Sequence, residues 1–131
     1  MDPFPFSLKG FVESLHRLTE RTSDDAFVVL QDKETDHFIQ FGRGPDLVLD
    51  LPLTPLSESQ TERAHAFFRN LGVQAPIEFD APDIENNTTR KHKVLQYNFG
   101  TNVGAAAQAA IDLFFAVYGP ISLSRFCTIQ N

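Results

Sequence analysis

The 131-residue sequence contains no tryptophan and only one cysteine, Cys127. A single thiol has no second cysteine in the chain to pair with, so a framework of intrachain disulfides is excluded. The apolar runs are too short or too interrupted to cross a bilayer. The first residues, Met1 to Phe6, carry neither a basic segment nor an apolar one. We therefore expect no secretory signal and a cytoplasmic location.

Basic residues are also few, because 11 Lys and Arg stand against 17 Asp and Glu and give a formal net charge of -6 at pH 7. Broad nucleic-acid and anionic-membrane surfaces require many Lys and Arg, so we expect neither as a partner. What the chain has in quantity is phenylalanine, with 13 copies within a hydrophobic content of 42%. That content excludes a disordered chain, and the length suits a single domain, 1–131, whose core needs no metal or cross-link.

Three segments have apolar residues at helical spacing after a capping residue, and they span about 7–22, 57–71 and 102–118. The second begins with a Ser-x-x-Gln capping box at Ser57 and ends at Gly72, which suits the left-handed conformation that commonly ends a helix. The third is apolar around most of its circumference, which indicates either burial on several sides or an interface.

Short runs of strand-forming residues lie between these helices. Ala26–Leu30, His37–Arg43 and Leu47–Leu51 are locally connected and predict an antiparallel meander, whose first strand is apolar enough to be covered on both faces. A weak pattern predicts a short strand at 77–79, and a clearer alternation predicts one at 93–99. Residues 121–130 add either an edge strand or an extended tail. The fold class expected is α+β, with an antiparallel sheet packed against two or three helices in the order α-β-β-β-α-β(-β)-α.

An acidic run from Glu78 to Glu85 precedes a basic run from Arg90 to Lys93. We interpret the two as arms of a solvated hairpin whose charges pair across the turn. Four basic residues on an acidic chain make a poor nucleic-acid site.

Signatures of catalysis are missing. A Gly-rich turn at Gly100–Gly104 precedes a helix, but it lacks the third Gly of a dinucleotide fingerprint and the Lys of a P-loop, so close packing of small residues explains it better. The four histidines lie on different expected elements, and none has a partner at metal-ligand spacing. We therefore expect a protein that is not an enzyme and holds no metal or cofactor.

Two stretches resemble a known family. Phe27-Val28-Val29-Leu30 followed by His37-Phe38-Ile39-Gln40-Phe41, and Leu56-Ser57-Glu58-Ser59-Gln60 through Leu71-Gly72-Val73-Gln74-Ala75-Pro76, resemble YbjN-like proteins, which are grouped with type III secretion chaperones. The resemblance implies a chaperone-like fold and a module that binds a protein or an extended peptide. It also implies a homodimer without cofactor or catalytic residues.

Surplus phenylalanine supplies the candidate partner site. Phe38, Phe68 and Phe115 lie off the main apolar stripes, and Gln40 shares the predicted strand face of Phe38. The other aromatic residues on the stripes are expected in the core, led by Phe11, Phe27, Phe41, Phe67, Phe99 and Phe114. Two alternatives remain open: an acidic immunity or antitoxin protein that blocks a basic partner with carboxylates around Glu78–Glu85, and an enzyme with a phosphate site at Gly100–Gly104.

Overall fold

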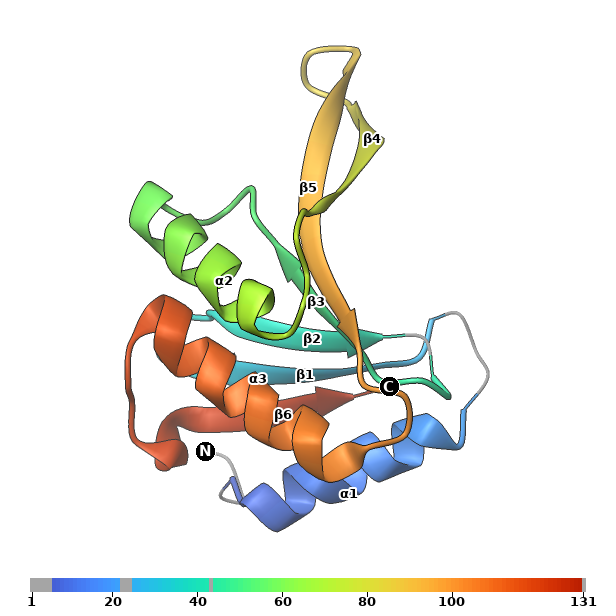
Figure 1. Ribbon diagram of the computed structural model, residues 1–131, viewed down its shortest axis with the longest axis vertical. Coiled ribbons are helices and arrows are strands. Elements are labelled where there is room, and N and C mark those ends of the chain that lie inside the picture. Colours follow the sequence, from blue (N-terminus) through green and yellow to red (C-terminus); the bar gives the residue numbers. More distant parts are fainter. Residues whose placement is uncertain (1–5, 22–24, 43, 131) are drawn as a thin grey trace.

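The computed structural model describes residues 6–21, 25–42 and 44–130, which form a six-stranded antiparallel sheet and three α-helices (Figure 1). In chain order the elements are α1 (Leu8–Thr19), β1 (Phe27–Asp32), β2 (Phe38–Gly42), β3 (Val48–Pro52), α2 (Glu58–Asn70), β4 (Ile77–Asp83), β5 (Thr88–Asn98), α3 (Val103–Tyr118), the 3-10 turn η1 (Leu123–Arg125) and β6 (Phe126–Gln130). The strand order is β4-β5-β3-β2-β1-β6. The expected α+β class, the β1-β2-β3 meander and the edge strand near the C-terminus are confirmed.

Side chains cap all three α-helices at their first turn. The Ser7 hydroxyl accepts a hydrogen bond from Gly10 N at 3.0 Å, and Ser57 forms the complete capping box with Gln60. Asn102 caps α3 by accepting from Ala105 N at 3.2 Å. These bonds satisfy amides that have no partner inside a helix, so the sequence places helix starts well. The end of α1 was predicted less well: the sequence pattern extended the helix to about residue 22, whereas α1 ends at Thr19.

All three helices pack on one face of the sheet (Figure 1), and contacts join α1 to β1, α3 to β2 and α2 to β5. Burial along β1 therefore alternates: Val28 and Leu30 are buried, whereas Phe27 and Val29 are only partly buried. The expectation that this strand is covered on both faces is wrong. A continuous apolar run is typical of a strand that is covered on both faces, but no described helix packs on the second face of β1.

The core lies between the sheet and the helices, with α3 in contact with both α1 and α2. Its largest fully buried side chains are aromatic: Phe11, Phe41, Phe68, Phe114 and Phe126. Phe68 was expected at the surface and Phe67 in the core, but Phe68 is fully buried and Phe67 only partly buried against the core. Consecutive helix positions differ by about 100° around the axis, so one residue of misplacement exchanges the two environments.

An ion pair between a buried carboxylate and a partly exposed guanidinium links the start of the C-terminal strand to β1. Arg125 donates to both carboxylate oxygens of Asp32, at 3.2 and 2.6 Å, and Asp32 is only 1% exposed. Thr35 Oγ1 and Glu34 N donate to the same carboxylate at 2.7 and 3.0 Å. Burial alone would raise the pKa of Asp32, but the hydrogen bonds from Arg125, Thr35 and Glu34 outweigh it and lower the pKa to about 2.

The outer part of the β4-β5 hairpin projects from the rest of the molecule (Figure 1), and we call residues 77–93 the arm. Both strands are longer than predicted, and within the arm β5 pairs with β4 alone. Lys93 Nζ lies 3.5 Å from Glu78 Oε1, and Arg90 Nε lies 3.9 Å from Asp83 Oδ2. The predicted hairpin with charges paired across its strands is confirmed.

Candidate protein-binding face

The face of the sheet opposite the helices, called the open face below, carries two of the predicted site residues. The register places Gln40 between Val29 on β1 and Asp50 on β3, and Asp50 beside Gln96 on β5. Phe38 lies two residues before Gln40 and therefore on the same face. Phe38 and Gln40 are thus brought together, as the strand pattern predicted.

Exposed apolar side chains gather on the open face. Of the seven large hydrophobic residues exposed among the described residues, four lie on it: Phe38 at 38%, Ile77 at 52%, Phe79 at 49% and Ile129 at 41%. They project from β2 and from the two edge strands β4 and β6, while Gln40, Asp50 and Gln96 supply polar side chains on the same face. A concentration of this kind has more meaning than single exposed hydrophobic residues, which are common on any surface.

A shallow hollow of about 230 Å³ lies on this face where the arm meets the sheet. Gln40, Asp50 and Gln96 are its polar residues, and Pro52, Phe79 and Val94 supply its apolar surface. Gln96 Nε2 donates to Asp50 Oδ1, which orders the polar part. The ring of Phe79 stacks on His92 with 5.5 Å between ring centroids, so it has a fixed position beside the hollow.

The other two predicted site residues lie elsewhere. Phe68 is fully buried, so its prediction as a surface contact is wrong. Phe115 is partly buried on α3 and stacks on Phe126 at 6.3 Å, among the helices. Neither adjoins Phe38. Sequence reasoning missed Ile77 and Phe79, although their alternation with Glu78 and Asp80 could have indicated an arm with one apolar face.

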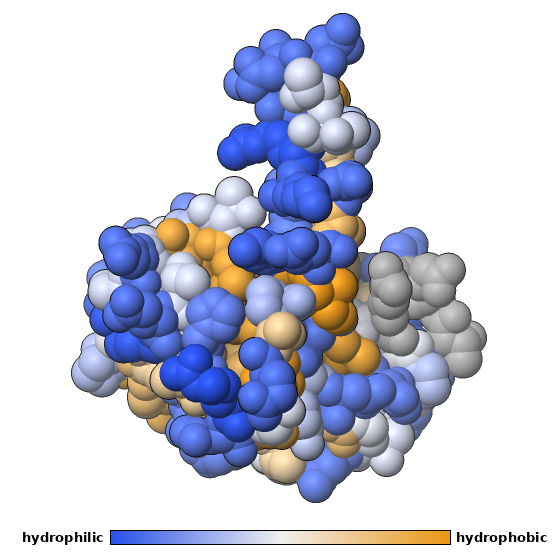
Figure 2. Space-filling view, turned by 45° about the horizontal axis from the view of Figure 1, so that its top comes forward, coloured by the Kyte–Doolittle hydropathy of each residue, from blue (hydrophilic) through white to orange (hydrophobic). Residues whose placement is uncertain are grey.

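Charged side chains of both signs are concentrated on the arm. Figure 2 shows a largely hydrophilic arm with apolar surface at its base. Two members of the acidic run, Glu78 and Asp83, pair with bases of β5. Asn86 Nδ2 also donates to Asp83 at 2.9 Å, and this bond is the main reason that the pKa of Asp83 lies below its ordinary value. The carboxylates proposed for a basic partner are therefore partly neutralised within the hairpin.

Other chemistries find less support in the described part of the chain. No three His, Cys, Asp or Glu side chains there come close enough to hold a metal ion. At the start of α3, Gly100 N donates to Asn98 Oδ1 at 2.6 Å and Ala105 N donates to Asn102, so two amides near the proposed phosphate turn already have partners. Within the same residues, no helix combines the length and the apolar character that a membrane span requires.

Comparisons with known proteins give no further assignment. No protein-family model matches the chain, and searches of curated proteins and of solved structures find no match either. The resemblance to YbjN-like proteins and secretion chaperones remains a prediction, and the open face is the structural basis for a functional proposal.

Proposed function

We propose that this chain is a non-catalytic, cytoplasmic protein-binding module, of the chaperone-like or adaptor kind, that holds an extended segment of another protein on its open face. The observation that carries the proposal is the exposure of Phe38, Ile77, Phe79 and Ile129 on a sheet face that no described helix covers. When a partner covers exposed apolar side chains, their removal from water lowers the free energy of the complex.

The shape of the face favours a polypeptide over a small molecule. Pockets for small ligands commonly enclose about 300–1,000 Å³. The hollow on the open face is smaller, about 230 Å³, and it is shallow. It has the size for one side chain of a longer ligand, while the amides of Gln40 and Gln96 can bond to polar groups of that ligand. The remaining apolar residues then contact side chains on either side of the one in the hollow.

Selection from a display library of random peptides tests the proposal. Enriched peptides are synthesised with a fluorophore and titrated against the protein and its variants. Phe38→Ser removes an apolar contact from the open face, and we expect binding to weaken about tenfold, since a buried aromatic contact contributes about 1–3 kcal/mol. The matched control is Leu123→Ser, which replaces a residue of similar exposure in η1. It should leave binding unchanged.

Two outcomes would contradict the proposal. One is that no peptide is enriched over an unrelated protein. The other is that the enriched peptides bind Phe38→Ser as tightly as they bind the original protein. If selection instead yields only strongly basic sequences whose binding disappears at high salt, the carboxylates of the arm are the site, as the immunity or antitoxin alternative requires.

We also propose a homodimer, as the resemblance implies. If the dimer contact lies away from the open face, Phe38→Ser will leave the sedimentation coefficient unchanged while it weakens peptide binding. Sedimentation velocity at micromolar concentration measures this directly. A single species of 14.7 kDa would contradict the dimer and leave the peptide-binding proposal standing.

A further inference from the structure

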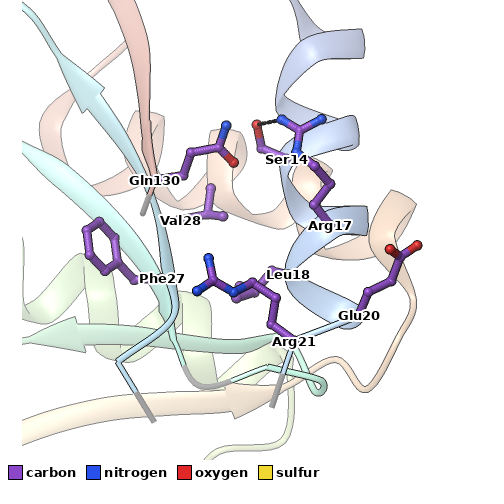
Figure 3. Close-up of a pocket in the computed structure, with 8 residues that line it drawn as sticks. All are labelled: Ser14, Arg17, Leu18, Glu20, Arg21, Phe27, Val28 and Gln130. Atoms are coloured by element: carbon purple, nitrogen blue, oxygen red, sulfur yellow. Dashed lines mark hydrogen bonds between the residues drawn. The ribbon is translucent and has the colours of Figure 1, made fainter. Parts of the chain in front are cut away.

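A cavity beside α1 and an unpaired strand edge in the arm both lie outside the proposed open-face contacts. The cavity has a volume of about 500 Å³ and lies between α1 and β1 (Figure 3). Its apolar residues Leu18 and Val28 are only 2% and 1% exposed, and Arg17 Nη2 already donates to Ser14 Oγ at 3.3 Å. Buried and already bonded side chains offer little to a ligand, so the strand edge is the stronger candidate.

The edge exists because neighbouring strands of the sheet differ in length. β5 spans Thr88–Asn98, whereas β3, beside it, ends at Pro52. The chain after β3 then leads away to α2 (Figure 1). Within the arm, β5 therefore pairs with β4 on one side and has no described strand on the other. We call this unpaired side of β5, at residues 89–93, the inner edge.

A hydrogen bond at the base of the arm shows which backbone groups point to the inner edge. Leu53 N donates to Lys93 O at 2.9 Å, so the backbone of Lys93 faces the side of β3. Successive residues of a strand alternate between its two sides, and Lys91 and Thr89 therefore point their amides and carbonyls the same way. In the described part of the chain, no backbone hydrogen bond reaches these groups on that side.

The two edges of the arm differ in how they are protected from pairing. On β4, the residues whose backbone points outward are Glu78, Asp80 and Pro82, since they alternate with those that pair with β5. Proline has no amide hydrogen, and charged residues on an edge discourage pairing. The inner edge has no proline, so its donors and acceptors are both available to a further strand.

Lys91 gives the inner edge its charge. Its side chain is exposed and forms no ion pair within the described residues, although Asp80 lies opposite it on β4. A lysine on an edge strand discourages pairing with apolar or basic strands. Opposite charges on directly facing residues of two strands instead stabilise the pairing. A strand on the inner edge is therefore expected to place an acidic residue opposite Lys91.

His92 sets the other half of the ligand pattern. It points to the side of the open face, where its ring stacks on Phe79. A ligand residue opposite His92 would continue the line of β3 beyond Pro52, and Pro52 and Phe79 both line the hollow. This position joins the inner edge to the apolar part of the open face, so an apolar ligand side chain fits it.

We propose that the inner edge pairs with an extended segment of a partner in which acidic and apolar residues alternate, the acidic one opposite Lys91 and the apolar one opposite His92. Such strand addition draws affinity from backbone hydrogen bonds and specificity from alternate side chains. The inference rests on the proposed function, because this segment is a stretch of the ligand that the open face holds. Directly opposite residues at Lys91 exchange backbone bonds, so the N–H groups of the acidic residues face β5 and those of the apolar residues face away.

A short peptide that alternates valine with glutamate, blocked at both ends and labelled with a fluorophore, is the probe. N-methylation of its glutamates removes the N–H groups that face β5, and binding measured by fluorescence anisotropy should weaken about tenfold. N-methylation of its valines is the matched control and should leave binding unchanged. Equal losses from the two modifications, or no binding of the unmodified peptide, would overturn the strand pairing.

The charge is tested by Lys91→Glu, with Lys9→Glu on α1 as a control that changes the net charge equally. Lys91→Glu should weaken binding of the glutamate peptide about fivefold, because facing like charges destabilise a strand pair. The same variant should bind a peptide of alternating valine and lysine more tightly than the original protein does. An equal loss in Lys9→Glu, or none in Lys91→Glu, would contradict the acidic ligand.

Amide hydrogen exchange of the original protein shows directly where the peptide strand lies. Binding should slow exchange at Thr89 and Lys91 and leave Glu78 and Asp80, on the outward side of β4, unchanged. Slowed exchange at Glu78 and Asp80 alone would place the strand on the other edge and overturn the proposal. Dissociation of a dimer when the peptide binds would show that a second copy occupies the inner edge, which also overturns it.

Failure here is distinguishable from failure of the proposed function. Peptides selected from the random library that bind through Phe38 but leave Thr89 and Lys91 unprotected would contradict the inner edge alone. Absence of binding by both the selected peptides and the glutamate peptide would contradict both proposals.

Discussion

The two faces of this sheet are built from the same strands and behave differently. On β2, Ile39 and Phe41 point toward the helices and are fully buried, whereas Phe38 points the other way and is 38% exposed. Successive side chains of a strand alternate between faces, so neighbouring residues meet different surroundings. The comparison teaches that alternate residues of one strand contribute to the core and to the exposed face on which we propose that a partner binds.

The arm extends this contrast beyond the body. Its register places Phe79 and His92 on the side of the open face, and Glu78 and Lys93 on the other side. An isolated two-stranded hairpin is only marginally stable in water. Substitutions in the arm should therefore have small effects on global unfolding compared with those in the helix-covered core.

The largest expected effect is at Phe41. Phe41→Ala leaves a cavity on the covered face and should lower the free energy of unfolding by about 3–5 kcal/mol. Phe38→Ala, three residues earlier on the same strand, should lower it by less than about 1 kcal/mol because the ring is already partly in water. Urea unfolding followed by circular dichroism measures both. Equal losses would show that the open face is not open in solution.

Next in size is the ion pair that holds β6. Arg125→Gln leaves the buried carboxylate of Asp32 without its cation, and the free energy of unfolding should fall by about 3 kcal/mol. The double variant Asp32→Asn, Arg125→Gln serves as the control, since it removes the buried charge as well. It should be more stable than Arg125→Gln alone. A double variant that is no more stable than the single one would argue against an uncompensated charge as the cause.

The same carboxylate predicts an acid dependence of stability. The pKa of Asp32 falls from 3.8 to about 2 on folding. A lowered pKa in the folded state contributes stability that is fully present well above 3.8 and is lost as the pH falls toward 2. The contribution is about 2 kcal/mol. Unfolding of the original protein and of Asp32→Asn across this range measures it, and identical pH profiles of the two would rule it out.

The smallest expected effect is in the arm. Lys93→Met breaks the pair with Glu78. The Lys93 side chain is 55% exposed and that of Glu78 is 49% exposed, so the free energy of unfolding should change by less than about 0.5 kcal/mol. Phe41→Ala measured in the same buffer gives the scale. A loss above about 1 kcal/mol would mean that the arm and the core unfold together, and it would contradict the small effect on global unfolding that we expect of substitutions in the arm.

Local sequence signals predicted much of this fold. Capping residues Ser7 and Ser57 located two helix starts, and strand alternation placed Phe38 and Gln40 on one face. These features depend on neighbours within a few residues. Class and strand connectivity followed because the strands are short and consecutive in the chain.

The remaining features depend on contacts between distant residues. The Asp32–Arg125 pair joins positions 93 apart, and no local pattern marks Asp32 as buried. Phe68 and Phe67 are adjacent on α2, so only the packing of that helix decides which of them enters the core. The apolar run of β1 led us to expect that both of its faces are covered. Such a run does not reveal how many layers a fold has, so the sequence could not show that helices cover only one face.

Isoleucine methyl NMR with a selected peptide tests the central claim most directly, because the six isoleucines sample different surfaces. Ile77 and Ile129 lie on the open face, Ile39 is buried beneath the helices, and Ile84 is 92% exposed at the end of the arm. Binding on the open face predicts that the peptide shifts the methyl signals of Ile77 and Ile129 and leaves that of Ile84 in place. Shifts confined to Ile84, or to Ile111 and Ile121 on the helix side, would contradict it.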